Sequence, residues 1–169
     1  VQIPAFVDLE VDLLGAALWE LGDDTAARRV RIPPLGADDI RRAARFRQPF
    51  HHPTVVYRRD AVVDAGGYRT DVGRFEDYVL FATMLMRGAK VANLAQPLVH
   101  YRIGAGAYAR RGGLDHFRNE VRLQQELRRI GLISRAEAVR NLISRGSYRL
   151  VPSAVRERIY SHFASSPAR

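Results

Sequence analysis

"VDLLGAALWEL", residues 11–21, is an apolar run that carries acidic groups only near its two ends. Its length and composition predict a buried β-strand that runs towards the edge of a sheet. A glycine and two aspartates follow at 22–24 and predict a turn. "RRVRIP", residues 28–33, can then pair back as a second strand before Pro33-Pro34 breaks the run. We therefore expect a β-hairpin near the start of the chain.

Strand and helix patterns are mixed over the following residues. The patterns predict helices at 37–46, 60–67 and 76–87, and strands at 54–59, 90–94 and 97–103. From Asp115 onwards, apolar residues recur at three- and four-residue spacings to the end of the chain. This organisation predicts an α/β fold followed by an all-helical C-terminal region.

Composition and charge bound the function. The 169 residues are 47% hydrophobic and 27% charged, with a net charge of +9, which is ordinary for one globular domain. Residues 1–24 hold six acids and no Lys or Arg, so the remainder carries 27 − 12 = +15. The chain has no cysteine, which excludes disulfides, thiolate metal sites and thiol catalysis and favours a cytoplasmic location. No apolar run approaches the roughly 20 residues that span a membrane.

The basic excess predicts a partner rich in phosphate, such as a nucleotide or an anionic membrane surface. Residues 109–169 hold 13 Arg against 5 acids on amphipathic helices. They can contact the inner face of an anionic membrane peripherally, or they can pack as an intramolecular clamp on the α/β part. The sequence carries no nucleic-acid recognition motif, and we expect no nucleic-acid partner.

Two adjacent carboxylates, Glu76 and Asp77, open the predicted helix 76–87. As caps they would accept hydrogen bonds from free amide groups, which contributes about 0.5–2 kcal/mol. As a catalytic base, the same position would hold a carboxylate rigidly and aim it into the space before the helix. The two roles are compatible, because the end of a helix is also a rigid mount.

The block "FHHPTVVYRRDAVVDAGGY", residues 50–68, combines histidines with a glycine pair. His51 and His52 are adjacent, so their side chains diverge, and no third ligand lies at helical spacing; a metal site here is weakly supported. Gly66 and Gly67 allow a backbone with positive φ, either as a simple helix terminator or close to another group.

The stretch "HYRIGAGAYARRGG", residues 100–113, begins as a strand, on which Tyr101 and Arg102 take opposite faces. It continues as a glycine-punctuated loop that ends in Arg110 and Arg111. A basic loop of this kind either binds a diphosphate through its guanidinium groups or is simply solvated.

Taken in order, these blocks resemble the second half of family 2 glycosyltransferases with the GT-A fold, which are nucleotide-diphospho-sugar transferases. The shared pattern is His-Pro before a strand with Arg-Arg, then Gly-Gly-Tyr, then Glu-Asp at a helix start, then Tyr-Arg about 24 residues later. The resemblance runs from about Val11 to Gly113, and the basic helices after it resemble the tails of such bacterial enzymes. It implies an acceptor-side half of the catalytic domain at 1–113, with a partial GT-A-type mixed sheet flanked by helices, and a basic helical tail at 114–169.

The resemblance implies an inverting transfer of sugar from a nucleotide-sugar donor to an acceptor hydroxyl, in cell-wall or polysaccharide biosynthesis. Asp77, with Glu76 beside it, would be the general base. The acceptor would be a glycan or a lipid-linked molecule. The substrate-binding residues would be His52, Arg59, Gly66, Gly67, Tyr68, Tyr101, Arg102, Arg110 and Arg111.

The pattern also departs from the family. The nucleotide-binding half and the Asp-x-Asp motif that holds a divalent metal precede the region that the resemblance covers. "DLE", residues 8–10, has the spacing of that motif, but its place before a strand favours a structural role. We therefore expect Mg²⁺ or Mn²⁺ for the full-length family, with ligands that are not present in this chain.

The resemblance also predicts how the chain behaves without the other half of the domain. Half of a sheet would leave an open edge, which predicts self-association and little or no activity without the other half. The alternative from another class is a catalytically inactive basic module that binds an anionic membrane surface or a partner chain.

Overall fold

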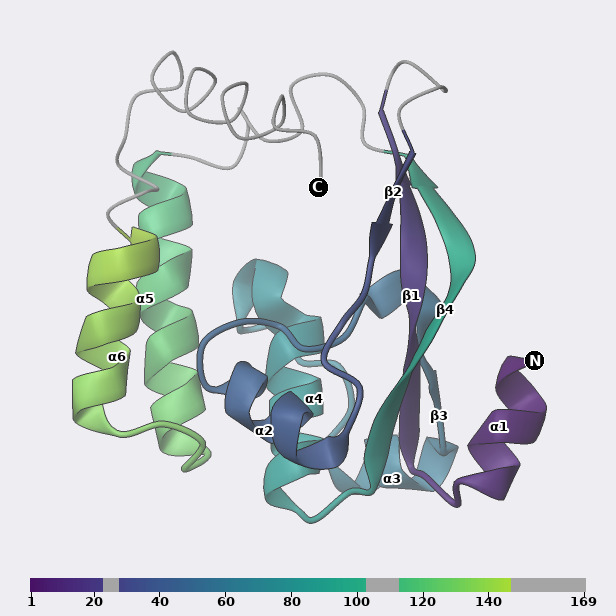
Figure 1. Cartoon of the computed structure of the whole chain (residues 1–169). Helices are drawn as coiled ribbons and strands as arrows, with labels where there is room; N and C mark the ends of the chain where they lie inside the picture. The colour runs from purple at the N-terminus through teal and green to yellow at the C-terminus, as the bar shows by residue number, and fades with distance from the viewer. Residues whose placement is uncertain (23–27, 103–112, 147–169) are drawn as a thin grey trace.

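The computed structural model describes residues 1–22, 28–102 and 113–146 as a four-stranded mixed sheet with helices on both faces (Figure 1). The strands are β1 (Leu13–Leu21), β2 (Arg28–Arg31), β3 (Val56–Tyr57) and β4 (Val91–Arg102). The α-helices are α1 (Gln2–Asp8), α2 (Ala37–Ala44), α3 (Arg59–Asp64), α4 (Glu76–Met86), α5 (Leu114–Arg129) and α6 (Arg135–Asn141). Short 3-10 helices span His52–Thr54 and Gly73–Phe75, and a π-helical turn spans Leu142–Gly146.

β1 is the strand on which the sheet is built. It pairs antiparallel with β2 and β3 and parallel with β4, so three strands hydrogen-bond to it. Residues 13–18 are buried, because side chains on both faces of this strand are covered. The expected hairpin between residues 11–21 and 28–33 is thereby confirmed, and the α/β class is confirmed with it.

Three sequence expectations are corrected by the structure. The strands expected at 90–94 and 97–103 form the single strand β4, with a register shift beside Pro97, which has no N–H to donate to the ladder. The strand expected at 54–59 shrinks to β3, because a 3-10 helix precedes it and Arg58 already caps α3. Residues 2–8, for which no helix was expected, form α1.

Three expected helices and one connecting segment agree with the structure, and two expected elements fall on residues that it does not describe. The helices expected at 37–46, 60–67 and 76–87 are confirmed as α2, α3 and α4. Helix α1 ends at Asp8, so the "DLE" segment connects α1 to β1 as its structural interpretation requires. The turn residues 23–24 and the last expected helix, beyond residue 147, lie outside the described residues.

Apolar side chains gather on both faces of the sheet. The larger cluster joins β1 to α2, α4 and α5, and most of α4 is buried in it. The smaller cluster, formed by Phe6, Val11 and Leu14, lies on the other face and packs α1. Helix α4 is therefore held between the sheet and the C-terminal helices, with its first turn at a fixed place (Figure 1).

A close contact between neighbouring strands explains Gly15 in β1. A Cβ atom at this position would lie 2.0 Å from Oδ1 of Asn93. The Asn93 side-chain amide donates to the carbonyl oxygens of Pro34 at 2.7 Å and Pro49 at 3.2 Å. One buried amide thus fastens two proline-containing loops to the sheet.

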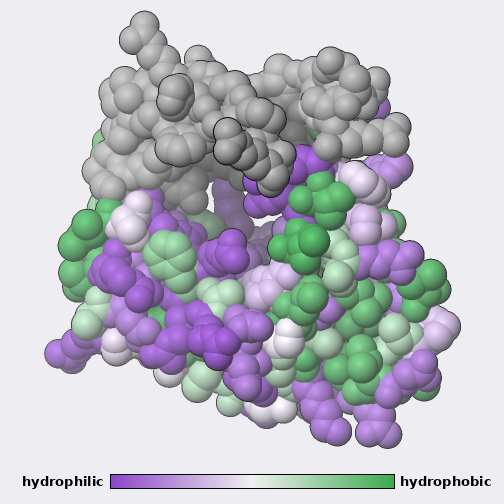
Figure 2. Space-filling model, viewed as in Figure 1, coloured by the Kyte–Doolittle hydropathy of each residue, from purple (hydrophilic) through white to green (hydrophobic). Residues whose placement is uncertain are grey.

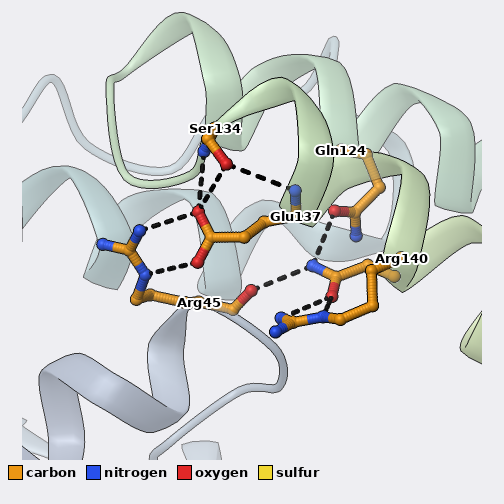
Figure 3. Close-up of polar contacts among 6 residues, drawn as sticks. Arg45, Gln124, Ser134, Glu137 and Arg140 are labelled. Carbon is orange, nitrogen blue, oxygen red and sulfur yellow. Dashed lines mark hydrogen bonds and ion pairs between the residues drawn. The ribbon is translucent and has the colours of Figure 1, made fainter.

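Helices α5 and α6 are attached to the α/β part through polar contacts (Figure 3). Ser134 and Glu137 form a capping box at the start of α6. The carboxylate of Glu137 also accepts two hydrogen bonds of 2.7 Å from the guanidinium of Arg45, just beyond α2. These hydrogen bonds, with those from Ser134, hold the pKa of Glu137 at about 2, below its usual range. Glu137 therefore joins two elements that are distant in the sequence.

We expect Glu137→Gln to lower the free energy of unfolding by about 1–2 kcal/mol at pH 7, because a charged acceptor is lost. The folded-state pKa of Glu137 lies below the ordinary 4.5, so its contribution is present above that pH and is lost as pH falls towards about 2. Urea unfolding at several pH values should show the difference between the two proteins narrowing below about pH 4.5. A difference that does not change down to about pH 3 would contradict this assignment.

Asp115→Asn is the matched control for this prediction. Asp115 is 89% exposed and pairs with Arg118 only across one helical turn, so its loss should change stability by no more than about 0.5 kcal/mol.

None of the helices in the described ranges is both long enough and apolar enough to cross a membrane.

Candidate active site

A cleft of about 620 Å³ opens between the β1–β2 side of the sheet and the C-terminal helices. Figure 2 shows a hollow at this place, between the α5–α6 side and the β2 side of the molecule. The loop from Arg47 to Pro53 and the start of α4 form its floor and walls. Its charged lining consists of Glu20, Arg31, Arg47, Arg74, Asp77 and Arg145, together with His51, His52 and His116.

Asp77 faces this cleft from the first turn of α4. Its Oδ1 accepts a hydrogen bond of 2.7 Å from the backbone N–H of Tyr78, and its side chain is 22% exposed. Its Oδ2 lies 3.6 Å from Nδ1 of His52. The N-cap residue of α4, Phe75, makes no side-chain cap, but Asp77 accepts from one amide of the first helical turn, as expected of a carboxylate there, and its side chain lines the cleft.

Glu76 is placed differently from its neighbour. Within the described part of the chain, its Oε2 is buried and has no hydrogen-bond partner. The residues that line the cleft include Asp77 but not Glu76. The two carboxylates that are adjacent in the sequence therefore have different surroundings, and only Asp77 is open to a ligand in the cleft.

His52 and Tyr68 complete a row of side chains with Asp77. The Tyr68 hydroxyl lies 3.3 Å from Nε2 of His52. Tyr68 reaches this place because Gly66 and Gly67 turn the chain after α3 with φ of 92° and 68°. The expectation of positive φ is confirmed, and the glycine pair ends α3 as a helix terminator, because nothing lies within 4 Å of a Cβ at either position.

The other candidate residues are spread out. Tyr101 lines the cleft, whereas Arg102 ends β4 as an exposed residue. Arg59 lies in a second cleft of about 540 Å³, beside Asp12 and Asp64. Arg110 and Arg111 lie outside the described residues. The structure therefore brings Asp77, His52, Tyr68 and Tyr101 together and places Arg59 elsewhere.

The sequence did not single out the other cations of the cleft. Arg74 stands three residues before Asp77, a closeness that could have drawn attention to it. Arg31 is paired with Glu20 at 2.8 Å on the neighbouring strand. Arg145 comes from the π-helical turn, where its ion pair with Glu120 at 3.2 Å holds it. No local sequence pattern predicts that Arg145, near the C-terminal end of the described residues, reaches the cleft. Because Arg31 and Arg145 already pair with carboxylates, Arg47 and Arg74 are the lining cations better suited to an anionic ligand such as a diphosphate.

His51 is more enclosed than His52. Burial, and next the charge of Arg31, lower the pKa of His51 below its ordinary 6.5, so it is neutral at physiological pH. No group of three His, Asp or Glu residues in the described ranges is arranged to hold a metal ion. Asp77 and His52 alone are too few donors for Mg²⁺ or Mn²⁺, which require about six ligands, mostly oxygen.

Known proteins resemble this chain in sequence. It is 34% identical, over 89% of its length, to 56% of the amylovoran biosynthesis glycosyltransferase AmsE of Erwinia amylovora. It is 32% identical, over 89% of its length, to 56% of an uncharacterized glycosyltransferase of Haemophilus influenzae. Over 73% of its length it is 32% identical to 44% of the UDP-Gal:alpha-D-GlcNAc-diphosphoundecaprenol beta-1,3-galactosyltransferase of Escherichia coli.

No family model matches the chain, and no solved structure matches it significantly. The chain spans about half the length of the curated relatives it matches. Over most of its own length, the chain is therefore a homologue of part of proteins named glycosyltransferases.

Proposed function

We propose that this chain carries the acceptor side of an inverting, family 2 glycosyltransferase site of the GT-A type, with Asp77 as the general base. The observation that carries the proposal is the place of the Asp77 carboxylate, fixed at the start of α4 and open to a cleft lined by arginines. The homology to proteins named glycosyltransferases supports the reaction class.

The proposed step is a single displacement. Asp77 accepts the proton of the acceptor hydroxyl, and the hydroxyl oxygen forms a bond to the anomeric carbon of the donor sugar. The bond from that carbon to the diphosphate oxygen breaks at the same time, and the nucleoside diphosphate leaves with the electron pair. An alcohol is a weak nucleophile at neutral pH, so a fixed base contributes about 10²–10⁴-fold to such a reaction.

The substrates follow as part of the same proposal. The name of the Escherichia coli relative specifies UDP-galactose and an acceptor linked to diphosphoundecaprenol, and AmsE is named for amylovoran biosynthesis. We propose a nucleotide-sugar donor and a glycan or lipid-linked acceptor for this chain. Arg47 and Arg74 in the cleft are suited to the phosphate groups of such substrates.

A divalent metal stays a prediction of the family resemblance. The described residues do not supply the donor set that Mg²⁺ or Mn²⁺ needs, so no step above passes through a metal bound by them. What these residues do in the proposal is hold the base, orient the acceptor hydroxyl and provide positive charge for the phosphates.

A transfer assay tests the proposed function. The protein is incubated with UDP-galactose, Mg²⁺ or Mn²⁺ and GlcNAc-diphosphoundecaprenol, both as this chain alone and as a chimera. In the chimera, this chain replaces the aligned segment of the Escherichia coli relative, which supplies the remaining part of that enzyme. A β-linked product from an α-linked donor supports the proposal. A folded chimera that gives an α-linked product would contradict inversion.

Membrane contact and self-association also stay predictions. We expect the chain to co-sediment with anionic liposomes and not with neutral ones, and to lose this binding when the basic helical tail, residues 114–169, is removed. Asp77→Asn should leave the binding unchanged, because the base is not part of the basic tail. Size-exclusion chromatography tests self-association, which a compact monomer would contradict.

A further inference from the structure

The imidazole of His52 is packed on two sides by aromatic rings. The Tyr68 ring lies roughly parallel to it, with centroids 5.9 Å apart, and the Phe81 ring meets it edge-on at 6.1 Å. Its backbone belongs to the 3-10 helix His52–Thr54, with Pro53 directly after it. A ring held in this way presents each of its two nitrogen atoms to a defined partner.

The partners of the two nitrogens differ in kind. Nε2 faces the Tyr68 hydroxyl at 3.3 Å, and Nδ1 faces Oδ2 of Asp77 at 3.6 Å. Burial, a hydrogen bond with Tyr57, and the charges of Asp77 and Glu76 raise the pKa of Tyr68 to about 12. The Tyr68 hydroxyl therefore keeps its proton at neutral pH and can donate it to Nε2.

This contact bears on the tautomer of His52, because the Tyr68 hydroxyl can either donate to Nε2 or accept a proton from it. A neutral imidazole carries one N–H and one acceptor nitrogen. When Nε2 accepts from Tyr68, the proton of the ring is on Nδ1, directed at Oδ2 of Asp77. The distance of 3.6 Å is longer than a hydrogen bond, and contacts of this kind in active sites commonly tighten when substrate binds.

The orientation of the Asp77 carboxylate then has two determinants. The backbone N–H of Tyr78 holds Oδ1, at 2.7 Å, and His52 faces Oδ2. Only the bond from Tyr78 is of hydrogen-bond length; if the 3.6 Å contact with His52 shortens when substrate binds, the carboxylate gains a donor on each side and its rotation is restricted. A base must be held in this way, because a misplacement of about 1 Å at a reacting centre can reduce the rate about 10²-fold.

We propose that His52 is a positioning residue, which holds the Asp77 carboxylate towards the acceptor hydroxyl while Tyr68 decides which ring nitrogen carries the proton. This inference rests on the proposed function, in which Asp77 is the base. It gives His52 a role on the base, whereas the family resemblance implied a contact with substrate.

The tautomer of His52 tests the arrangement without any need for activity. The chain labelled with ¹⁵N-histidine gives signals from five histidines, and His52→Asn identifies the one that belongs to His52. In the neutral form of the ring, we expect the His52 proton on Nδ1. In Tyr68→Phe, which keeps the ring stacking and removes the hydroxyl, the population should shift towards Nε2–H. A proton found mainly on Nε2 in the unchanged chain would overturn the proposal.

Kinetics with two substitutions separate positioning from substrate contact. His52→Leu removes both nitrogens, whereas His52→Asn keeps an N–H on the branch nearest Asp77. In the transfer assay, with the chimera where this chain alone is inactive, we expect His52→Leu to lower kcat about 10²-fold with KM within about twofold. His52→Asn should recover most of that loss.

Other results would count against the inference. Equal losses in both variants, or a raised KM with unchanged kcat, would make His52 a substrate contact and overturn it. Transfer that survives Asp77→Asn would overturn the proposed function instead, while the tautomer measurement would still show whether Tyr68 sets the protonation of His52. Thermal unfolding of His52→Leu and Tyr68→Phe is the control that tests whether each variant is folded.

Discussion

Asp77→Asn is expected to lower kcat for sugar transfer about 10²–10⁴-fold, with little change in KM, because the substitution removes the proton acceptor and little of the binding surface. The asparagine side chain can still accept the hydrogen bond that the Tyr78 amide donates to Oδ1. The helix should therefore begin at the same residue, and the loss should reflect chemistry. The measurement is initial-rate kinetics with UDP-galactose in the chimera and in this chain.

Asp38→Asn is the matched control for Asp77→Asn. Asp38 also lies in the first turn of a helix, α2, but its side chain is 88% exposed and it does not line the cleft. Both substitutions remove one negative charge near the start of a helix, which is worth about 0.3–1 kcal/mol of stability. Transfer should stay within about twofold in Asp38→Asn. An Asp77→Asn protein as active as this control would mean that another group is the base.

Arg145→Met is expected to destabilise the protein by about 3 kcal/mol, because it breaks an ion pair whose carboxylate is fully buried. Glu120 is 0% exposed, and its Oε2 lies 3.2 Å from Nη2 of Arg145. The same guanidinium donates to the carbonyl oxygen of Phe46, so it joins the π-helical turn to the segment after α2. The measurement is the free energy of unfolding in urea, compared at pH 7 with that of the unchanged chain.

A double substitution distinguishes a charge effect from a loss of packing. Glu120→Gln together with Arg145→Met removes both charges and should recover at least about 1 kcal/mol relative to Arg145→Met alone. Arg118→Met is the control, since the Arg118–Asp115 pair is 70% and 89% exposed and is worth at most about 0.5 kcal/mol. A double variant that is less stable than Arg145→Met would mean that Glu120 stabilises the fold independently of Arg145.

The buried network around Glu120 also explains how the C-terminal helices are seated. Gln124 donates to Glu120 at 3.0 Å, and Asn141 donates to Gln124 at 3.0 Å and to the carbonyl oxygen of Arg45 at 2.9 Å. The side chains of Glu120, Gln124 and Asn141 are all buried, so each needs a hydrogen-bond partner. The partners come from α5, α6 and the end of α2, which fixes these elements relative to one another.

The elements differ in how far their local sequence predicts them. An apolar run predicted β1, a turn followed by a pairing segment predicted β2, and helical patterns predicted α2 and α4, because all of these are local properties of the chain. It failed for β4, where Pro97 looks like a break but the strand continues on both sides of it. It also failed for α1, a seven-residue helix that contains a proline and is too short for a periodic signal.

The motifs predicted some residues of the candidate site correctly but not the position of every one. Motif order drew attention to Asp77, His52, Tyr68 and Tyr101, and the structure brings these four side chains to one cleft or into contact with it. Their roles in transfer stay predictions until the variants are measured. The same motifs gave no indication that Arg59 would lie in a different cleft, because its position depends on how α3 packs beside α4.

The sequence by itself determined the α/β class, the hairpin that starts the sheet, and the helix that carries a carboxylate pair at its first turn. Each of these depends on residues close together along the chain. Only the tertiary structure decided that Asp77 opens to the cleft while Glu76 does not, that His52 faces Asp77 from 25 positions away, and that Arg145 reaches the same cleft. Such contacts depend on the packing of whole elements around a shared core, which no local spacing records.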